Sequence, residues 1–291
     1  MTPGKQKLVI AALFVVFLCM IPLLIFYSMG YRLRVELKLV QTGGIYISNE
    51  EPDAVLYING KEIKRSGVII QNLLIQDLKP DVYTVRFEKE NCTPWTKKVP
   101  VKAKRVSVCY PLLLPQEIKP VEIKKYIPAE KKDLKTKNTR HTVNDEYIEV
   151  NKLFKKAAMH SAAIFPGSLQ REVLKPGKNL KMQGRVLLGL EKNRIYVTWT
   201  GKKKNMPFFI NTMKRKQVFT SLERITHFDF YPGRSDSFLA RLAGGNLVAV
   251  EMDTRFGENI STVLLKRCDR FIVHNLTLYY YSGSRLYKYD L

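Results

Sequence analysis

An uninterrupted apolar run near the start of the chain constrains this sequence more than any other feature. From Leu8 to Met29, about 22 residues carry no charged side chain, and as a helix they would span roughly 33 Å, against a hydrocarbon core of about 30 Å. The run is therefore long enough to cross a bilayer. The sequence predicts a short tail at residues 1–7 and a transmembrane helix at residues 8–29, whose partner is the lipid bilayer.

A cleavable signal peptide is the alternative interpretation of this run. Ser28 and Gly30 have the small-residue spacing of a cleavage site, but the apolar core of a signal peptide usually has only about 7 to 15 residues. The length therefore favours an uncleaved, single-pass signal anchor. Basic residues flank the run on both sides, so local charge does not decide its orientation. Because long domains cross membranes largely regardless of charge, we expect a cytoplasmic N-terminus and an extracytoplasmic bulk.

The charge balance narrows the partners of the rest of the chain. The 291 residues include 49 Lys and Arg against 26 Asp and Glu, which gives a formal net charge of +23. Lys5 and Lys7 are the only charged residues before Gly30, so almost all of the excess lies beyond the apolar run. Anionic envelope polymers or lipid headgroups are the expected partners of such a basic protein. Hydrophobic residues make up 45% of the chain, which excludes a wholly disordered protein.

Residues 43–115 have the pattern of short strands separated by turns. Asn59-Gly60 lies between two apolar runs and is suited to the positive φ angles of a type I′ hairpin. Val82–Glu88 alternates strictly, which predicts a strand with one buried and one wet face, and Trp95 opens the next strand. The pattern predicts a small β-sandwich that ends with the apolar run Val106–Leu114.

Several short matches in this module resemble, in the right order, the PEGA domain. They are Glu51-Pro52-Asp53-Ala54, Val55-Leu56-Tyr57-Ile58-Asn59-Gly60, Asn72-Leu73, Leu78-Lys79-Pro80, Tyr83-Thr84-Val85 and Pro94-Trp95. The sequence departs from the family at Asp53 and Asp81, where the family usually has glycine, at Ser66-Gly67, where Thr-Pro is common, and at Asn91-Cys92, where Gly-Tyr is expected. Asn and Asp tolerate left-handed turns, so these departures affect turn details more than the fold. The resemblance implies a β-sandwich module of bacterial and archaeal surface proteins.

Residues 116–143 are rich in basic side chains and poor in large apolar ones, which predicts an extended basic linker. A basic strip that lies on anionic polymer or headgroups is the alternative. Beyond it, Tyr147–Ala158 fits either a short helix or a strand. Strand-like runs then return in three sets, with the spacing of propeller blades of about 40 to 50 residues. The expected strands are Arg185–Leu190, Arg194–Trp199, Met206–Asn211, Gln217–Thr220, Ile225–Phe230, Phe238–Leu242, Leu247–Glu251, Ser261–Leu265, Phe271–His274, Leu276–Tyr281 and Arg285–Tyr289.

The chain as a whole is therefore expected to be mainly β. Residues 144–291 would form an antiparallel, β-propeller-like domain of about three blades, too few for a ring that normally has four to eight. The phrases Phe228–Asp236, Val250–Arg255 and Leu286–Leu291 look like blade strands of the propeller-type region that accompanies PEGA modules in membrane-anchored bacterial proteins.

No catalytic, cofactor-binding or metal-binding set is recognised in the sequence. A P-loop, a dinucleotide fingerprint, a nucleophile elbow and a His-Glu-x-x-His pair are all missing, and Gly201–Asn205 has the composition of a charged hairpin tip. His227 with Asp229 would share a strand face, where a structural hydrogen bond is favoured over a ligand or metal site.

Three further groups of residues have both a structural and a functional interpretation. Glu251 and Asp253 share a face with Arg255, which favours local charge pairing over metal binding or acid–base chemistry. Cys92 and Cys109 lie in one module and could pair in an oxidising compartment. The tyrosine group near the C-terminus favours strand packing over a stacking platform and consists of Tyr279, Tyr280, Tyr281, Tyr287 and Tyr289, with Arg285 and Lys288 nearby.

The sequence therefore predicts a non-enzymatic, membrane-anchored surface protein that displays two β modules for binding or scaffolding at the cell envelope, without a cofactor. A membrane-tethered nucleic-acid-binding protein is the alternative, suggested by the net charge of +23 and the tyrosines. It ranks lower because the basic residues are spread over all segments. A hydrolase is a third hypothesis, and Glu251 and Asp253 are its best acid–base candidates.

Overall fold

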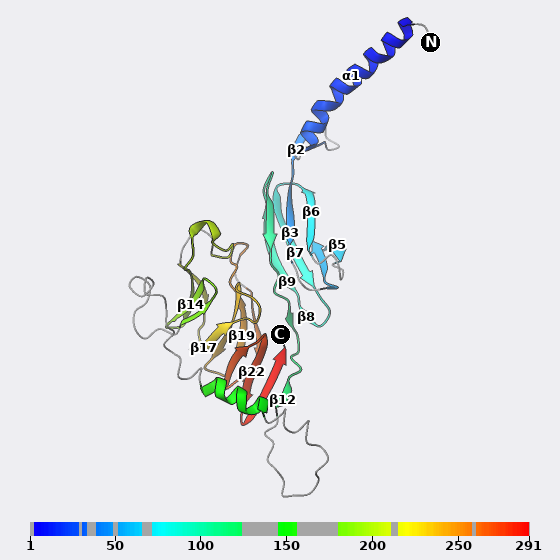
Figure 1. Cartoon of the computed structure of the whole chain (residues 1–291). Helices are drawn as coiled ribbons and strands as arrows, with labels where there is room; N and C mark the ends of the chain where they lie inside the picture. Colours follow the sequence, from blue (N-terminus) through cyan, green and yellow to red (C-terminus); the bar gives the residue numbers. More distant parts are fainter. Residues whose placement is uncertain are drawn as a thin grey trace. The chain divides into compact units, whose positions relative to one another are not determined.

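The chain folds into two compact units, residues 1–113 and 114–291 (Figure 1). The computed structural model describes residues 3–28, 31–33, 39–48, 52–65, 72–123, 145–155, 180–210, 215–257 and 260–290. Residues 124–143 of the expected linker, which include His141, lie outside the described residues, as does His160.

Unit 1 begins with the long helix α1 (Pro3–Ser28). Its segment Val9–Ser28 has a mean hydropathy of 3.1 over 20 residues, and none of that segment is buried against protein. In length and composition α1 suits either a single-pass membrane anchor or a signal sequence. After it, β1 (Tyr31–Leu33) and β2 (Leu39–Gln41) form an antiparallel pair.

The rest of unit 1 is a β-sandwich of one three-stranded and one four-stranded sheet. Alternate residues of its strands are buried, among them Ile45, Phe87 and Trp95, so the two inner faces form the core. In sheet order the first sheet contains β10 (Val106–Cys109), β3 (Gly43–Ile47) and β6 (Leu73–Leu78), and the second contains β5 (Lys61–Arg65), β4 (Val55–Ile58), β7 (Asp81–Glu88) and β9 (Trp95–Val101); β8 is the short strand Cys92–Thr93.

The local predictions for this module are largely confirmed. Asn59 and Gly60 have φ angles of 50° and 81° and join β4 to β5, where Ile58 lies opposite Lys61. In β7, Val85 and Phe87 are buried while Thr84 and Arg86 are exposed. The closing strand ends at Cys109, and Leu114 already belongs to unit 2.

Unit 2 is built from three antiparallel four-stranded sheets. Within the described residues the three sheets do not close into a ring, so the propeller-like arrangement is not confirmed. The first strands of successive sheets lie in contact, β13 with β17 and β17 with β21. The sheets are β13 (Leu180–Gln183), β14 (Val186–Glu191), β15 (Arg194–Trp199) and β16 (Arg215–Thr220); β17 (Ile225–Phe230), β18 (Ser237–Leu242), β19 (Leu247–Glu251) and β20 (Ser261–Leu265); and β21 (Arg270–His274), β22 (Thr277–Ser282), β23 (Arg285–Asp290) and β12 (Val121–Ile123).

Part of residues 116–143, the segment predicted to be an extended linker, belongs to the third sheet. β12 lies inside that segment, and the short strand β11 (Leu114–Pro115) directly precedes it. β12 pairs antiparallel with β23, so that Ile123 lies opposite Leu286. Ile123 is 4% exposed because the helix of residues 145–155, drawn in green in Figure 1, packs on the same side through Val150 and Phe154. The helix also decides between the two interpretations of Tyr147–Ala158, as far as Lys155.

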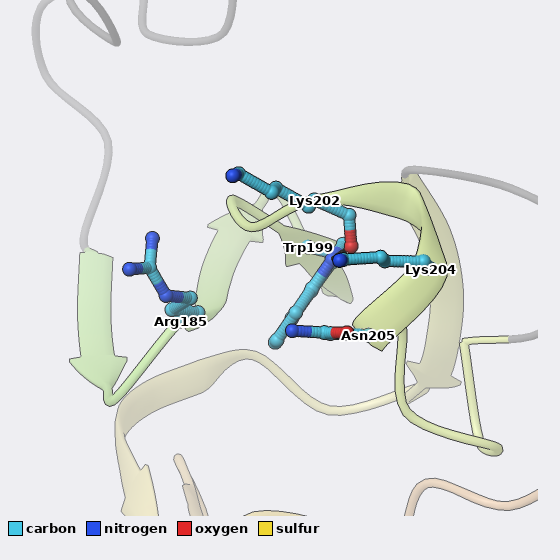
Figure 2. Close-up of a pocket in the computed structure, with 5 residues that line it drawn as sticks. All are labelled: Arg185, Trp199, Lys202, Lys204 and Asn205. Atoms are coloured by element: carbon cyan, nitrogen blue, oxygen red, sulfur yellow. Dashed lines mark hydrogen bonds between the residues drawn. The ribbon is translucent and has the colours of Figure 1, made fainter.

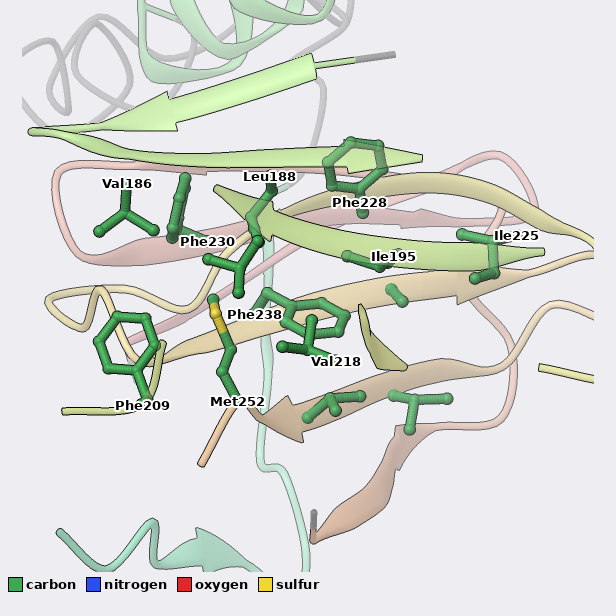
Figure 3. Packing of buried hydrophobic residues seen from close by; sticks show 14 of the residues in the cluster. Val186, Leu188, Ile195, Phe209, Val218, Ile225, Phe228, Phe230, Phe238 and Met252 are labelled. Carbon is green, nitrogen blue, oxygen red and sulfur yellow. The ribbon is translucent and has the colours of Figure 1, made fainter. Parts of the chain in front are cut away.

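The largest core of unit 2 lies between its first two sheets, as Figure 3 shows. Leu188 and Ile195 from the first sheet meet Phe228 and Phe238 from the second. Neither sheet buries this face by itself, so the two sheets depend on each other.

One expected strand is wrong over its described part. Instead of a strand at Met206–Asn211, the chain forms the short 3-10 helix η1 (Lys203–Asn205) and then a turn at residues 208–210. The apolar run is buried all the same, because Phe209 and Ile210 fill the core from a loop. The fourth strand of this sheet is β13 instead, at the opposite edge.

The β21–β22 hairpin generates the first prediction, because Asn275 and Leu276 have φ angles of 47° and 66°. These are the angles of a type I′ turn, where a side chain at the second position costs about 1–2 kcal/mol. Leu276 is 60% exposed, so its side chain contributes little packing. We expect Leu276→Gly to raise the free energy of unfolding of unit 2 by about 1 kcal/mol in urea titrations.

The matched control is the Asn59-Gly60 hairpin. Nothing lies within 4 Å of a Cβ built on Gly60, so Gly60→Ala tests backbone strain alone and should destabilise unit 1 by about 1 kcal/mol. A loss of stability in Leu276→Gly would mean that the leucine side chain stabilises the turn.

Candidate functional site

A group of ionisable side chains lies where the first strands of the sheets meet in unit 2. Lys181 of β13 forms an ion pair with Asp229 of β17, with Nζ 2.8 Å from Oδ2. Arg241 of β18 donates from Nε to the Cys268 carbonyl oxygen over 2.6 Å and from Nη1 to Thr226 Oγ1 over 2.7 Å. The Lys181–Asp229 pair joins the first two sheets, and the Arg241 contacts tie β18 to β17 and to the loop before β21, so the first role of these contacts is structural.

His227 lies in the same group but does not join Asp229 in a site. Its ring makes an edge contact with Phe271, 4.9 Å between centroids, and its Nε2 is buried without a hydrogen-bond partner among the described residues. Burial, and next the charge of Lys181, lower the pKa of His227 to about 4, although Asp229 works in the opposite direction. A neutral histidine of this kind is a poor general base at neutral pH.

Cys268 is also excluded as a nucleophile. The residue is fully buried, and burial raises the pKa of its thiol to about 12. The described residues contain no group of three or more His, Cys, Asp or Glu side chains that could hold a metal ion.

Asp253 and Arg255, expected to pair locally, form a two-pronged ion pair. Arg255 Nε lies 2.9 Å from Asp253 Oδ1, and Nη2 lies 2.8 Å from Oδ2. The guanidinium also lies over the ring of Phe208, 4.6 Å from its centroid. Asp253 and Glu251 are only 2% and 1% exposed, so solvent and substrate do not reach the proposed acid–base pair.

A second pair, which the sequence analysis did not single out, lies in the loop between β17 and β18. Arg234 Nε and Nη2 donate to the two oxygens of Asp236, each over 2.8 Å. Burial works against the charge of Arg234, but the hydrogen bond to Asp236 and the charges of Asp236 and Glu251 outweigh it and raise the pKa of the guanidinium. Residues two apart in the chain make both pairs, so the spacing Arg-x-Asp or Asp-x-Arg was the available signal.

The C-terminal tyrosines hold the third sheet together. Tyr280 and Tyr281 are 4% and 6% exposed. Tyr280 stacks on Tyr287 with 5.3 Å between centroids, and burial raises the pKa of Tyr280 to about 12. The Tyr281 hydroxyl donates to Asn151 Oδ1 of the helix over 2.5 Å. The two buried rings are therefore not available as a platform for bases or sugars.

A basic pocket lies at one end of the first sheet. Its volume is about 380 Å³, and it is lined by Arg185, Trp199, Lys202, Lys204 and Asn205. Figure 2 shows Arg185, from the turn between β13 and β14, on one side and the loop after β15 with Lys202 and Lys204 on the other. The sequence analysis expected a charged hairpin tip at Gly201–Asn205, but it gave no sign that Arg185 would face this loop.

No family model matches the sequence, and no curated protein is similar to it. Among solved structures, the N-terminal domain of Nup159 has a TM-score of 0.27 and 11% identity over 40% of this chain and 31% of that domain. The complex of S. cerevisiae Dbp5 with Nup159, Gle1, IP6 and ADP gives a TM-score of 0.27 and 12% identity over the same shares. A protein of unknown function from Bacteroides fragilis, described as membrane-associated, has a TM-score of 0.19 and 12% identity over 86% of this chain and 94% of that one. Likenesses at these TM-scores do not bear on fold or function.

The low pKa of His227 makes the stability of unit 2 depend on pH. In the unfolded chain the ring takes up a proton near its ordinary pKa of 6.5, whereas the folded ring does so only at about 4. The contribution of the neutral His227 ring to the free energy of unfolding is therefore fully present above pH 6.5, and the free energy should fall by about 3 kcal/mol as the pH drops to 4.

We expect His227→Phe, which keeps an aromatic ring beside Phe271, to remove this part of the pH dependence in urea titrations at pH 4 to 7. His274→Gln, at the end of β21, is the control and should leave it unchanged. A difference between His227→Phe and the natural chain that stays constant with pH would contradict this assignment.

The Asp253–Arg255 pair provides a third prediction. Arg255→Met leaves a buried carboxylate without its cation, so the free energy of unfolding should fall by about 3 kcal/mol. Adding Asp253→Asn should recover most of this loss, because the buried charge is then removed as well.

Arg285→Met is the matched control for that measurement. Arg285 and Glu122 are 3.9 Å apart with side chains 67% and 34% exposed, and such solvated pairs are worth about 1 kcal/mol or less. Equal losses in Arg255→Met and Arg285→Met would show that burial of Asp253 does not decide the outcome.

Proposed function

We propose that the chain is a single-pass membrane protein that holds two β units at the cell envelope, where they bind or scaffold other molecules without catalysis. The observation that carries this proposal is the uncovered apolar surface of α1. Phe14, Phe17 and Leu24 are each at least 60% exposed, and none of the 20 residues Val9–Ser28 is buried. Such a helix is costly in water, at roughly 25 cal/mol for each Å² of apolar surface, and stable in hydrocarbon.

The length of the helix supports an anchor over a cleaved signal peptide. The apolar segment Val9–Ser28 has 20 residues, longer than the apolar core of about 7 to 15 residues that signal peptides have. Basic residues flank it on both sides, so the proposed orientation, with a cytoplasmic N-terminus, rests on the tendency of long domains to cross membranes regardless of charge.

The turns of the sandwich support the resemblance to the PEGA domain. Of the three positions where that family usually has glycine, Asp81 has no positive φ angle, whereas Asp53 and Asn91 have φ angles of 61° and 58°. Both positions therefore need the left-handed backbone for which glycine is best suited, and Asp and Asn are the side chains that tolerate it best. The two φ angles therefore agree with the glycines of the family in backbone conformation, although the residues differ.

The net charge of +23 supports anionic envelope polymers or lipid headgroups as partners. It would also suit nucleic acid, but binding of single strands relies on exposed aromatic rings. Tyr280 and Tyr281 are buried, so that alternative loses part of its support.

The test follows the intact chain in its own membranes. We expect it to stay in the membrane fraction after a carbonate wash, to release fragments of residues 30–291 on protease treatment of intact cells, and to keep the peptide with Lys5 and Lys7. Mass spectrometry of the N-terminal peptide reads the last point directly.

Phe17→Arg combined with Leu18→Arg is the matched variant. Each arginine at the middle of the helix costs about 2.5–3.5 kcal/mol of insertion, so the variant should move to the soluble fraction. A natural N-terminus directly after Gly30 would show a cleaved signal peptide, and full-length chain in the carbonate supernatant would exclude the anchor.

A further inference from the structure

The loop beside the basic pocket is fixed by contacts that do not involve its cations. Trp199 Nε1 donates to the Lys202 carbonyl oxygen over 3.0 Å, and the Thr200 amide and hydroxyl both donate to the Arg185 carbonyl oxygen over 2.9 Å. The main chain that carries Arg185 and Lys202 is therefore held in place before any ligand arrives.

Gly201 allows this arrangement because the loop lies directly on the indole. A Cβ at this position would be 2.5 Å from the Trp199 ring and 2.8 Å from the Arg185 side chain. A larger residue would push the loop off the ring and away from Arg185. A preformed site loses less entropy on binding, so the cost of ordering the loop is already met by the fold.

The charges around the pocket are of one sign and are not neutralised. Among the described residues, Arg185, Lys202 and Lys204 form no ion pair, and the pocket lining includes no carboxylate. Asn205 adds an amide that can donate a hydrogen bond. The arginine fork matches phosphate oxygens in pairs, and the lysines act as point charges beside it.

The size of the pocket limits the ligand to a small group. A volume of about 380 Å³ is near the lower end of the range of small-molecule sites, about 300–1,000 Å³. We infer that this pocket binds a phosphate group, carried by a small soluble molecule or by a lipid headgroup.

A second pocket in the same sheet shows why charge decides the assignment. It lies at the opposite end, has a volume of about 560 Å³ and is lined in part by Lys192, Arg194 and Glu191. Glu191 forms an ion pair with Arg215, whose guanidinium lies 4.2 Å from the Tyr196 ring centroid. Lys192 and Arg194 stay positive, but the Glu191 carboxylate in this lining would repel an anion, whereas the lining of the first pocket has no carboxylate.

The inference deepens the proposed binding role and rests on it, but its test measures the affinity for a ligand and not the retention of the chain in membranes. The protein can therefore be anchored and fail to bind phosphate, or bind phosphate and prove to be cleaved from its helix. The two outcomes are measured by different experiments.

The test uses the full chain in nanodiscs of phosphatidylcholine. Glycerol 3-phosphate is titrated by calorimetry and by tryptophan emission; the chain has two tryptophans, and Trp95 is 1% exposed, so Trp199 reports the pocket. We expect saturable binding that weakens about tenfold in Lys202→Gln and in Lys204→Gln, the usual effect of losing one charge-assisted hydrogen bond.

Lys203→Gln is the matched control, because Lys203 lies between these residues and does not line the pocket. It removes the same charge from the same loop and should change the affinity less than twofold. Equal weakening in all three variants would overturn the inference. Saturable binding neither to glycerol 3-phosphate nor to the phosphatidylglycerol vesicles described below would overturn it as well.

A second arm distinguishes the two sources of phosphate. Vesicles of phosphatidylglycerol are added to the same nanodisc-embedded chain and its variants. Binding to the vesicles alone, with the same dependence on Lys202 and Lys204, would assign the pocket to a headgroup, whereas binding of glycerol 3-phosphate would assign it to a soluble ligand. Vesicle binding that ignores these two lysines would be surface attraction only and would count against the pocket.

Discussion

The shared apolar face between neighbouring four-stranded sheets is the constraint on which unit 2 depends. A single sheet of this size leaves one face in water, and here Leu188 and Ile195 of the first sheet are buried only because Phe228 and Phe238 of the second cover them. The Lys181–Asp229 ion pair joins the first strands of the same two sheets. Phe209 comes shortly after the pocket loop in the chain and is buried in this core. The core therefore also holds one end of the pocket loop in place.

The third sheet solves the same problem with parts that are distant in sequence. Its outer strand, β12, and the helix of residues 145–155 come before the first sheet in the chain, while β21, β22 and β23 come last. Ile123, Val150 and Leu286 meet in one small core, and Tyr281 is hydrogen-bonded to Asn151. Because the sheet needs both early and late segments, it can be complete only when the whole of unit 2 has been made, which ties its folding to long-range contacts.

The sequence was informative wherever a local pattern decided the structure. Alternation identified β7, and the Asn59-Gly60 pair fixed the β4–β5 hairpin, because both features act over a few residues. It failed where tertiary contacts decided. Val121–Ile123 is too short to be recognised as a strand without its partner β23. The apolar pattern at Phe209 and Ile210 predicts a strand, although these residues fill the core from a turn. The Asp253–Arg255 pair was predictable from spacing, whereas the pocket was not, since Arg185 reaches it from another turn.

Ion pairs withdraw three carboxylates of unit 2 from its surface. Asp229, Asp236 and Asp253 are each engaged by a cation two residues away or on a neighbouring strand, and they are largely withdrawn from water. Each pair removes one charge of either sign from the surface, so the excess of basic residues remains unchanged and is concentrated in what stays exposed. Lys202 and Lys204 belong to that remainder. Their mutual repulsion at the pocket is unfavourable in the free protein, and a bound anion is the simplest way to relieve it.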